Sequence, residues 1–238
     1  MDNQHRAMTG AQTMDMSTDQ GLRTFMLGVY NHMIVAMGIT GAVAFFFSQS
    51  PQLMKAVFST PLGFVVMFAP LGFVFFLAAR VNKMSPSAAR LTFYIFAAVM
   101  GVSLSTIFMR YTGMAIAQIF FMTAAMFGAL SLWGYTTKKD ISGWGSFLFM
   151  GVIGIIIASI VNIFLGSSAI QFAVSVLGLL IFAGLTAYDT QRLKQSYYIL
   201  AGDVAMAARV SIMGALSLYL NFLNMFLFML SLFGGGRN

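Results

Sequence analysis

The chain has 238 residues, of which 59% are hydrophobic and only 8% are charged, whereas soluble domains carry about 25% charged residues. This composition excludes an ordinary soluble domain and indicates a polytopic membrane protein. The formal net charge of +7 comes from lysines and arginines in short connectors, so it indicates membrane orientation and not nucleic-acid binding. Cysteine is absent, which excludes disulfides, thiolate catalysis and cysteine-rich metal sites.

Residues 1–24 are polar, carry three aspartates and contain few branched or aromatic side chains. This composition is typical of a disordered segment, and it lacks the basic start of a cleaved signal peptide. We therefore expect a disordered cytoplasmic tail at 1–24, followed by one transmembrane domain at 25–238.

Seven continuously apolar runs follow the tail. A helix needs about 20 mostly apolar residues to cross a bilayer, whereas strands of a membrane barrel alternate between apolar and polar residues. The sequence therefore predicts an all-α fold with seven transmembrane helices. The predicted spans are Phe25–Phe47, Pro61–Ala79, Leu91–Met109, Met114–Tyr135, Trp144–Leu165, Ala169–Tyr188 and Val210–Phe233.

The basic residues are distributed unequally between the two sides of these spans. Ten of the 13 lie in the tail or in the second, fourth and sixth connectors, and three lie on the opposite side. Because positively charged connectors stay in the cytoplasm, we predict a cytoplasmic N-terminus and an external C-terminus. The ten are Arg6, Arg23, Arg80, Lys83, Arg90, Lys138, Lys139, Arg192, Lys194 and Arg209.

A proline interrupts the second predicted span. Pro70 has no backbone N–H, so it should kink this helix and free the carbonyl of Val66. Such a kink can border a cavity, but proline is common in membrane helices, and we favour a structural role.

The sixth span ends in the only acidic residue close to a transmembrane segment. The chain has no glutamate, and the aspartates other than Asp189 fall in the tail or in connectors. A charge near hydrocarbon is costly unless it is paired, hydrated or protonated, and an anion at a helix C-terminus is also unfavourable. Two interpretations remain open: a closed site in which Arg80 supplies the counter-charge, or a surface pair with Arg192, three residues further on.

The seventh span carries a polar face. Gly214, Ser217, Asn221 and Asn224 share one side of a helix. Asparagines in an apolar helix need hydrogen-bond partners inside the bundle, so this face should point inward. Asn221 lies halfway along the span, where we expect it to meet a polar group of another helix.

Three segments, in this order, resemble signatures of the Bax inhibitor-1 (transmembrane Bax-inhibitor-motif) family, and in particular its bacterial branch. They are MSPSAARLTFYIFAAVMGVSLSTIF at 84–108, YDTQ at 188–191 and GALSLYLNFLNMF at 214–226. The resemblance implies a seven-helix bundle in which the other six helices surround the last one. It also implies a pH-sensitive calcium leak, since the better-studied members act in this way, whereas eukaryotic members suppress cell death.

The same resemblance implies a particular site. In the family, the aspartate of the YD motif lies near a second aspartate on the last helix; here the two positions are Asp189 and Asn221. Two carboxylates titrate as a coupled pair, so a single one should give a weaker pH response, or one at lower pH, and should bind calcium more weakly. A basic residue of the second helix latches onto this site in the family, and Arg80 is the match. Tyr188, Ser217 and Asn224 are expected to support the site.

We therefore predict a pH-modulated cation (calcium) leak channel of a bacterial inner membrane, built around Asp189, Asn221 and Arg80. The alternative is a non-transporting regulator that binds a membrane-anchored AAA protease, as bacterial relatives are thought to do, through a surface such as the tail. Beyond the lipid bilayer we expect no nucleic-acid partner, no cofactor and no firm metal site, only a transient calcium contact at Asp189. An enzyme is not expected, because the last span has no aspartate and no HExxH motif occurs.

Overall fold

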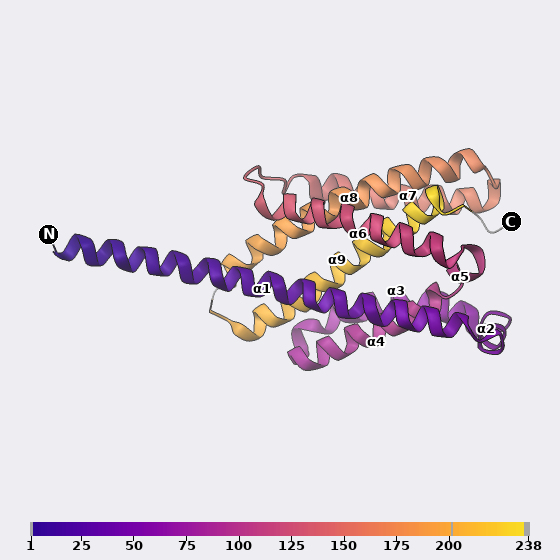
Figure 1. Ribbon diagram of the computed structural model, residues 1–238, viewed down its shortest axis with the longest axis horizontal. Coiled ribbons are helices and arrows are strands. Elements are labelled where there is room, and N and C mark those ends of the chain that lie inside the picture. Colours follow the sequence, from indigo (N-terminus) through magenta and orange to yellow (C-terminus); the bar gives the residue numbers. More distant parts are fainter. Residues whose placement is uncertain (1, 201, 236–238) are drawn as a thin grey trace.

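The computed structural model describes residues 2–200 and 202–235, without the side chains of residues 2–18 and residue 82, and this part of the chain is almost entirely helical (Figure 1). No strand occurs in the ranges described, so the all-α prediction is confirmed. The helices are α1 (Asp2–Ser48), α2 (Pro51–Phe58), α3 (Leu62–Arg80), the 3-10 helix η1 (Val81–Lys83), α4 (Pro86–Leu104), α5 (Ile107–Arg110), α6 (Gly113–Thr136), α7 (Trp144–Leu165), α8 (Ser168–Ile199) and α9 (Val204–Phe233).

Seven helical segments within the described residues are long and apolar enough to cross a membrane, and they correspond to the seven predicted spans. The third span consists of α4 and α5, which follow one another from Pro86 to Arg110. The short helix α2 lies in the connector after the first span, where no helix was predicted. The orientation of the bundle in the membrane stays a prediction.

Three of the later predicted spans stop short of their helices by five residues or more, and one is the third span, where α4 begins at Pro86 instead of Leu91. Helix α8 continues from Tyr188 to Ile199, and α9 begins at Val204 instead of Val210. The predictions followed the loss of apolar residues, which marks where a chain leaves hydrocarbon and not where its helix stops. Asp189 therefore lies inside a helix, and the unfavourable end of the helix dipole, which acts within the last turn, does not apply to it.

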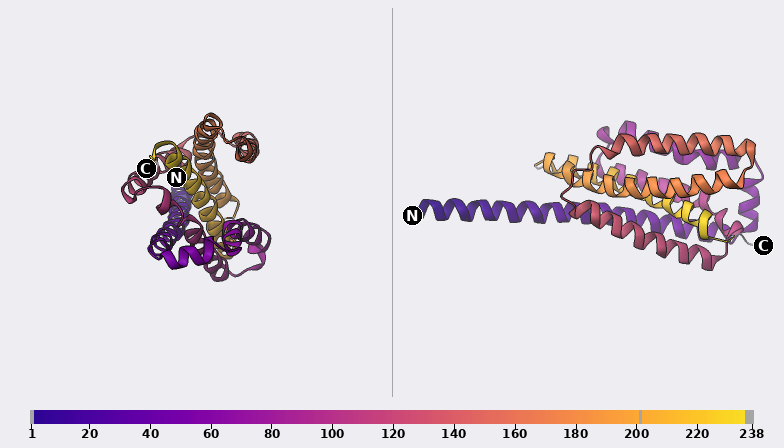
Figure 2. Two further views of the ribbon diagram at one scale, coloured as in Figure 1. Left: turned by 90° about the vertical axis from the view of Figure 1, so that its right-hand side faces the viewer. Right: turned by 90° about the horizontal axis from the view of Figure 1, so that it is seen from above.

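Helix α1 also differs from expectation at its start. It begins at Asp2, so residues 2–24, predicted to be disordered, continue the helix of the first span. This part of α1 projects well beyond the other helices (Figure 2). The segment has no proline to stop a helix that the first span has already nucleated. The division of the chain into a tail and a transmembrane domain stays a prediction.

Helix α9 is the central helix, as predicted. The most apolar part of α9 is 56% buried, against at most 28% in any of the other six spans. It runs obliquely between α1, α3 and α4 on one side and α6, α7 and α8 on the other (Figures 1 and 2). Its Tyr219 is fully buried and packs edge-on against Phe93 and Phe96 of α4, with ring centroids 5.6 and 5.7 Å apart. The polar residues of α9 are thereby held inside the bundle.

Pro70 lines a cavity beside α3, and the carbonyl that it was predicted to free is used by a neighbouring helix, whereas the kink stays a prediction. Helix α3 continues through this proline, and the carbonyl of Val66 accepts a hydrogen bond from Ser103 Oγ of α4 at 2.7 Å. The carbonyl that proline leaves without its backbone partner is thus satisfied by the neighbouring helix, which joins α3 to α4.

Candidate functional site

Asp189 lies at the contact between α8 and α9. Its carboxylate accepts two hydrogen bonds on one oxygen, Oδ2: from Ser217 Oγ at 2.7 Å and from Asn221 Nδ2 at 2.8 Å. The two donors are four residues apart on α9, so they stand on one face of that helix. Asp189 is only 8% exposed, and Asn221 is 5% exposed. The structure thus brings together three of the residues predicted for the site.

The second oxygen of Asp189 is not enclosed. Among the described residues no hydrogen bond reaches Oδ1, and every fully buried side-chain nitrogen or oxygen has a partner. Oδ1 must therefore be accessible from a neighbouring space. Asn221 donates through its nitrogen, so the same reasoning applies to its own Oδ1.

That space is a cavity of about 1060 Å³ between the α3–α4 pair and α7–α8, with α9 at its back. Asn224 and Tyr188 line it together with Asp189, Ser217 and Asn221. Asn224 donates its amide to the carbonyl of Leu220 in its own helix at 2.8 Å, and within the described part of the chain it makes no hydrogen bond to another helix. The remaining polar lining consists of Ser103, Ser146, Ser159 and Arg192.

The predicted counter-charge is not at the site. Arg80 is exposed at the last turn of α3, and it does not line the cavity around Asp189. Helix α3 packs against α4, and the cavity separates it from α8. Arg192 borders the cavity, but it is exposed, and no ion pair with Asp189 is formed in the described part of the chain. Among the described residues, only neutral donors stabilise this carboxylate. Neither of the ion pairs considered from the sequence, with Arg80 or with Arg192, is formed.

The four residues of the YDTQ segment each contact a different part of the bundle, because successive side chains on a helix point about 100° apart. Tyr188 packs on α7, where a Cβ at Gly145 would lie 2.5 Å from the tyrosine hydroxyl oxygen. Asp189 binds α9, Thr190 binds α6, and Gln191 binds the connector between α6 and α7. This one turn of α8 therefore contacts α6, α7, α9 and the connector between α6 and α7.

Thr190 belongs to a chain of hydroxyl groups that sequence reasoning missed. Its Oγ1 lies 3.0 Å from Ser131 Oγ of α6, which in turn is hydrogen-bonded to the Tyr30 hydroxyl of α1. Thr190 donates to the carbonyl of Thr186, one turn earlier, at 2.8 Å. The chain links α1, α6 and α8 beside Asp189. Serine and threonine can satisfy themselves within their own helix, so nothing in the sequence distinguishes those that join helices.

Gln191 was also missed, and it gives a direct prediction. Its amide donates to the carbonyl of Lys139 at 2.8 Å and accepts from the backbone N–H of Ile141 at 3.0 Å. In Gln191→Ala these two backbone groups lose partners worth about 1 to 3 kcal/mol. We expect hydrogen exchange at the Ile141 amide to become at least about tenfold faster.

Gln195→Ala is the matched control, because Gln195 is exposed one turn further along α8. Unchanged exchange at Ile141 in Gln191→Ala, or equal acceleration in both variants, would show that Gln191 does not hold the connector.

The site contains one carboxylate. The described residues include no group of three or more histidine, cysteine, aspartate or glutamate side chains that could hold a metal ion. Around the carboxylate, the cavity offers a cation the free oxygen of Asp189, the amide oxygen of Asn221 and the hydroxyl of Ser217. These are the hard oxygen ligands that calcium prefers, although calcium normally takes six to eight of them, so water must supply the rest.

Fold and site together define a polytopic α-helical membrane protein with a single carboxylate buried between its last two helices. Comparison with known proteins gives its family. The family model described as "Inhibitor of apoptosis-promoting Bax1" matches residues 22–238, and the chain belongs to this Bax inhibitor-1 family. The resemblance seen in the three sequence segments is confirmed.

Similar proteins occur in several bacteria. A protein of Caulobacter vibrioides is 50% identical over 236 residues, covering 95% of this chain and 94% of the relative. The inner membrane protein YbhL of Escherichia coli K12 is 43% identical over 219 residues, covering 91% of this chain and 94% of the relative. A Rickettsia prowazekii protein is 43% identical over 220 residues, covering 92% and 93%. Together with the seven spanning helices, the similarity to YbhL identifies a multi-pass inner-membrane protein.

Proposed function

We propose that this protein is a pH-modulated cation leak of the inner membrane, with calcium as the permeant ion and Asp189 as the acid of the ion site. The observation that supports the proposal is the buried carboxylate with one oxygen toward a large cavity and no cationic partner among the described residues. A charge within a membrane-spanning bundle that has no structural counter-ion is expected to serve an ion or a proton.

The neutral partners of Asp189 suit a leak better than a storage site. Ser217 and Asn221 orient the carboxylate without neutralising it, so its charge remains to attract a cation. A single carboxylate completed by water should hold calcium weakly, and conduction requires binding that is favourable enough for entry and weak enough for release. The proposal gives Asp189 no catalytic role.

Protonation gives the pH dependence. When Asp189 takes up a proton, its charge is lost, and the attraction for a divalent cation is lost with it. The Asn221 amide can turn and accept from the protonated acid, so the helix contact survives the change. Cation flux should therefore fall as the pH is lowered. Arg192 also lines the cavity. Its guanidinium stays positively charged at neutral and mildly acidic pH, so it repels a cation at both.

Calcium flux into liposomes that contain the purified protein tests this proposal. With a calcium-sensitive dye inside, we expect wild-type liposomes at neutral pH to fill clearly faster than protein-free liposomes, and the difference to shrink at mildly acidic pH. Rates equal to those of empty liposomes at both pH values would contradict a calcium leak.

A second candidate function is favoured by one feature, the start of α1 that projects beyond the bundle (Figure 2). We propose that, if the protein does not transport ions, this segment binds a membrane-anchored AAA protease. Removing residues 1–20 separates the two functions, because a leak through the bundle should survive the deletion, whereas binding to such a protease should be lost. Binding that persists without this segment would contradict the second candidate.

A further inference from the structure

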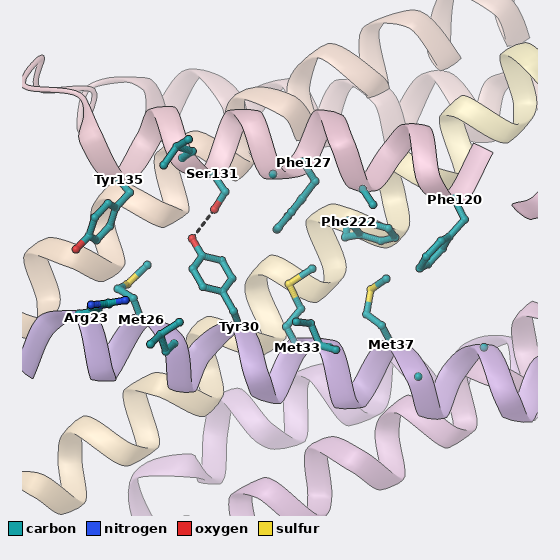
Figure 3. A pocket seen from close by; sticks show the side chains of 17 residues that line it. Arg23, Met26, Tyr30, Met33, Met37, Phe120, Phe127, Ser131, Tyr135 and Phe222 are labelled. Atoms are coloured by element: carbon teal, nitrogen blue, oxygen red, sulfur yellow. Dashed lines mark hydrogen bonds between the residues drawn. The ribbon is translucent and has the colours of Figure 1, made fainter. Parts of the chain in front are cut away.

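A second cavity lies between α1 and α6 (Figure 3), and it shares no lining residue with the cavity of Asp189. It measures about 900 Å³ and forms a groove along the two helices, which pack mainly against other helices and not against each other. Phe222 of α9 lies at its floor.

The polar lining of this groove is confined to one end. Helices α1 and α6 run antiparallel, so the beginning of the first span in α1 and the end of α6 lie together, and Figure 3 shows Arg23 and Tyr135 across from each other there. Tyr30 and Ser131 follow, joined by their hydrogen bond. Beyond them both walls are formed by methionine, phenylalanine, aliphatic and glycine residues. The groove is thus amphipathic along its length.

The polar end is also positively charged. Arg23 is exposed there, and no ion pair is formed between Arg23 and Asp19, one turn earlier, in the described structure. Lys194 of α8 adds a second cation: its Nζ donates to the carbonyl of Tyr135 at 3.0 Å and lies 5.2 Å from the centre of the Tyr135 ring. Arg23 and the two tyrosines therefore line this end of the groove, and Lys194 lies behind Tyr135 without lining it.

We propose that this groove binds an anionic phospholipid, with an acyl chain along the apolar walls and the phosphate beside Arg23, while the charge of Lys194 behind Tyr135 adds to the positive potential. Both walls belong to membrane-spanning helices, so the molecules that reach the groove are those of the bilayer. Hydrocarbon matches the apolar length, and the cations favour a headgroup that carries net negative charge over a zwitterionic one. The site is separate from the cavity of Asp189 and does not depend on ion transport.

The groove can be filled without disturbing the fold. At Gly128 an added Cβ would meet no atom within 4 Å, and this residue lines the groove. In Gly128→Phe the aromatic ring should therefore occupy the space of the acyl chain. Gly154→Phe is the matched control: Gly154 also has nothing within 4 Å, but it lies on α7, outside the groove.

The headgroup contact is tested by Arg23→Gln, with Lys55→Gln as control, because Lys55 is an exposed cation of α2 outside the groove. The full chain is taken from vesicles of equal amounts of phosphatidylglycerol and phosphatidylethanolamine, and bound lipid is measured by native mass spectrometry. We expect wild type and both controls to retain phosphatidylglycerol in preference to phosphatidylethanolamine. In Arg23→Gln the ratio of the two bound lipids should fall about fivefold, and Gly128→Phe should lose the bound lipid.

Equal retention of the two lipids by wild type would overturn the proposal. The proposal would also be overturned if Gly128→Phe retained as much lipid as Gly154→Phe and Arg23→Gln kept the same lipid preference as Lys55→Gln. Arg23 is exposed, so its replacement tests the headgroup contact even if Gly128→Phe does not fold.

Discussion

Asp189→Asn should lower calcium influx at neutral pH by about tenfold or more, since a loss of about 1.4 kcal/mol in stabilisation of the ion already corresponds to this factor. The replacement keeps the size of the side chain and still accepts from Ser217 and Asn221 through its amide oxygen. What it removes is the charge that faces the cavity. The remaining influx should also no longer depend on pH.

Asp203→Asn provides the matched control. Asp203 is exposed at the start of α9, where its carboxylate accepts from the backbone N–H of Met206 at 2.9 Å, and asparagine caps a helix equally well. This variant should leak like wild type. A leak in Asp189→Asn as fast and as pH-sensitive as in Asp203→Asn would exclude Asp189 from the ion site.

Gly134→Ala should destabilise the bundle by about 1 to 3 kcal/mol, which is the usual cost of overpacking. Helices α6 and α8 approach closely here: an added Cβ at Gly134 would overlap the carbonyl oxygen of Ala187 and lie 2.9 Å from its Cα. Backbone atoms cannot rotate away, so the helices must separate. Ala187 lies two residues before Asp189, so the separation would also displace the site.

Thermal unfolding of the purified protein in detergent measures this effect. Gly128→Ala is the control on the same helix, because its new methyl group meets nothing within 4 Å. We expect a clearly lower unfolding temperature for Gly134→Ala and an unchanged one for Gly128→Ala. Equal unfolding temperatures would show that α6 and α8 have room for a side chain at this contact.

The sequence predicted the features that depend on local composition. Runs of apolar residues located the seven spans, and the polar face of α9, with Ser217 and Asn221 one turn apart, was predicted to point inward. A membrane helix has few polar residues, and each of them needs a partner inside the bundle, so the position of Asn221 carries much information. The meeting of Asn221 with Asp189 followed only from the family resemblance.

Features that depend on how the helices pack could not be predicted. Arg80 was expected at Asp189 because both lie at the same end of their helices, but the sequence does not show that a cavity separates α3 from α8. The contacts of Thr190 and Gln191 depend equally on which elements surround α8. The loss of apolar residues after Tyr188 gave the wrong end for α8, because the polar residues of its next turn are buried and find hydrogen-bond partners in neighbouring elements.

The measurement that tests the central claim most directly is the pH dependence of calcium influx in Asn221→Asp beside wild type. Asn221 donates to Asp189 at 2.8 Å, so an aspartate there places two carboxylates in contact, and each raises the proton affinity of the other. We predict a steeper pH response, displaced to higher pH, which disappears when Asp189→Asn is added. Identical pH profiles for wild type, Asn221→Asp and the double variant would contradict the assignment of the ion and pH site to Asp189.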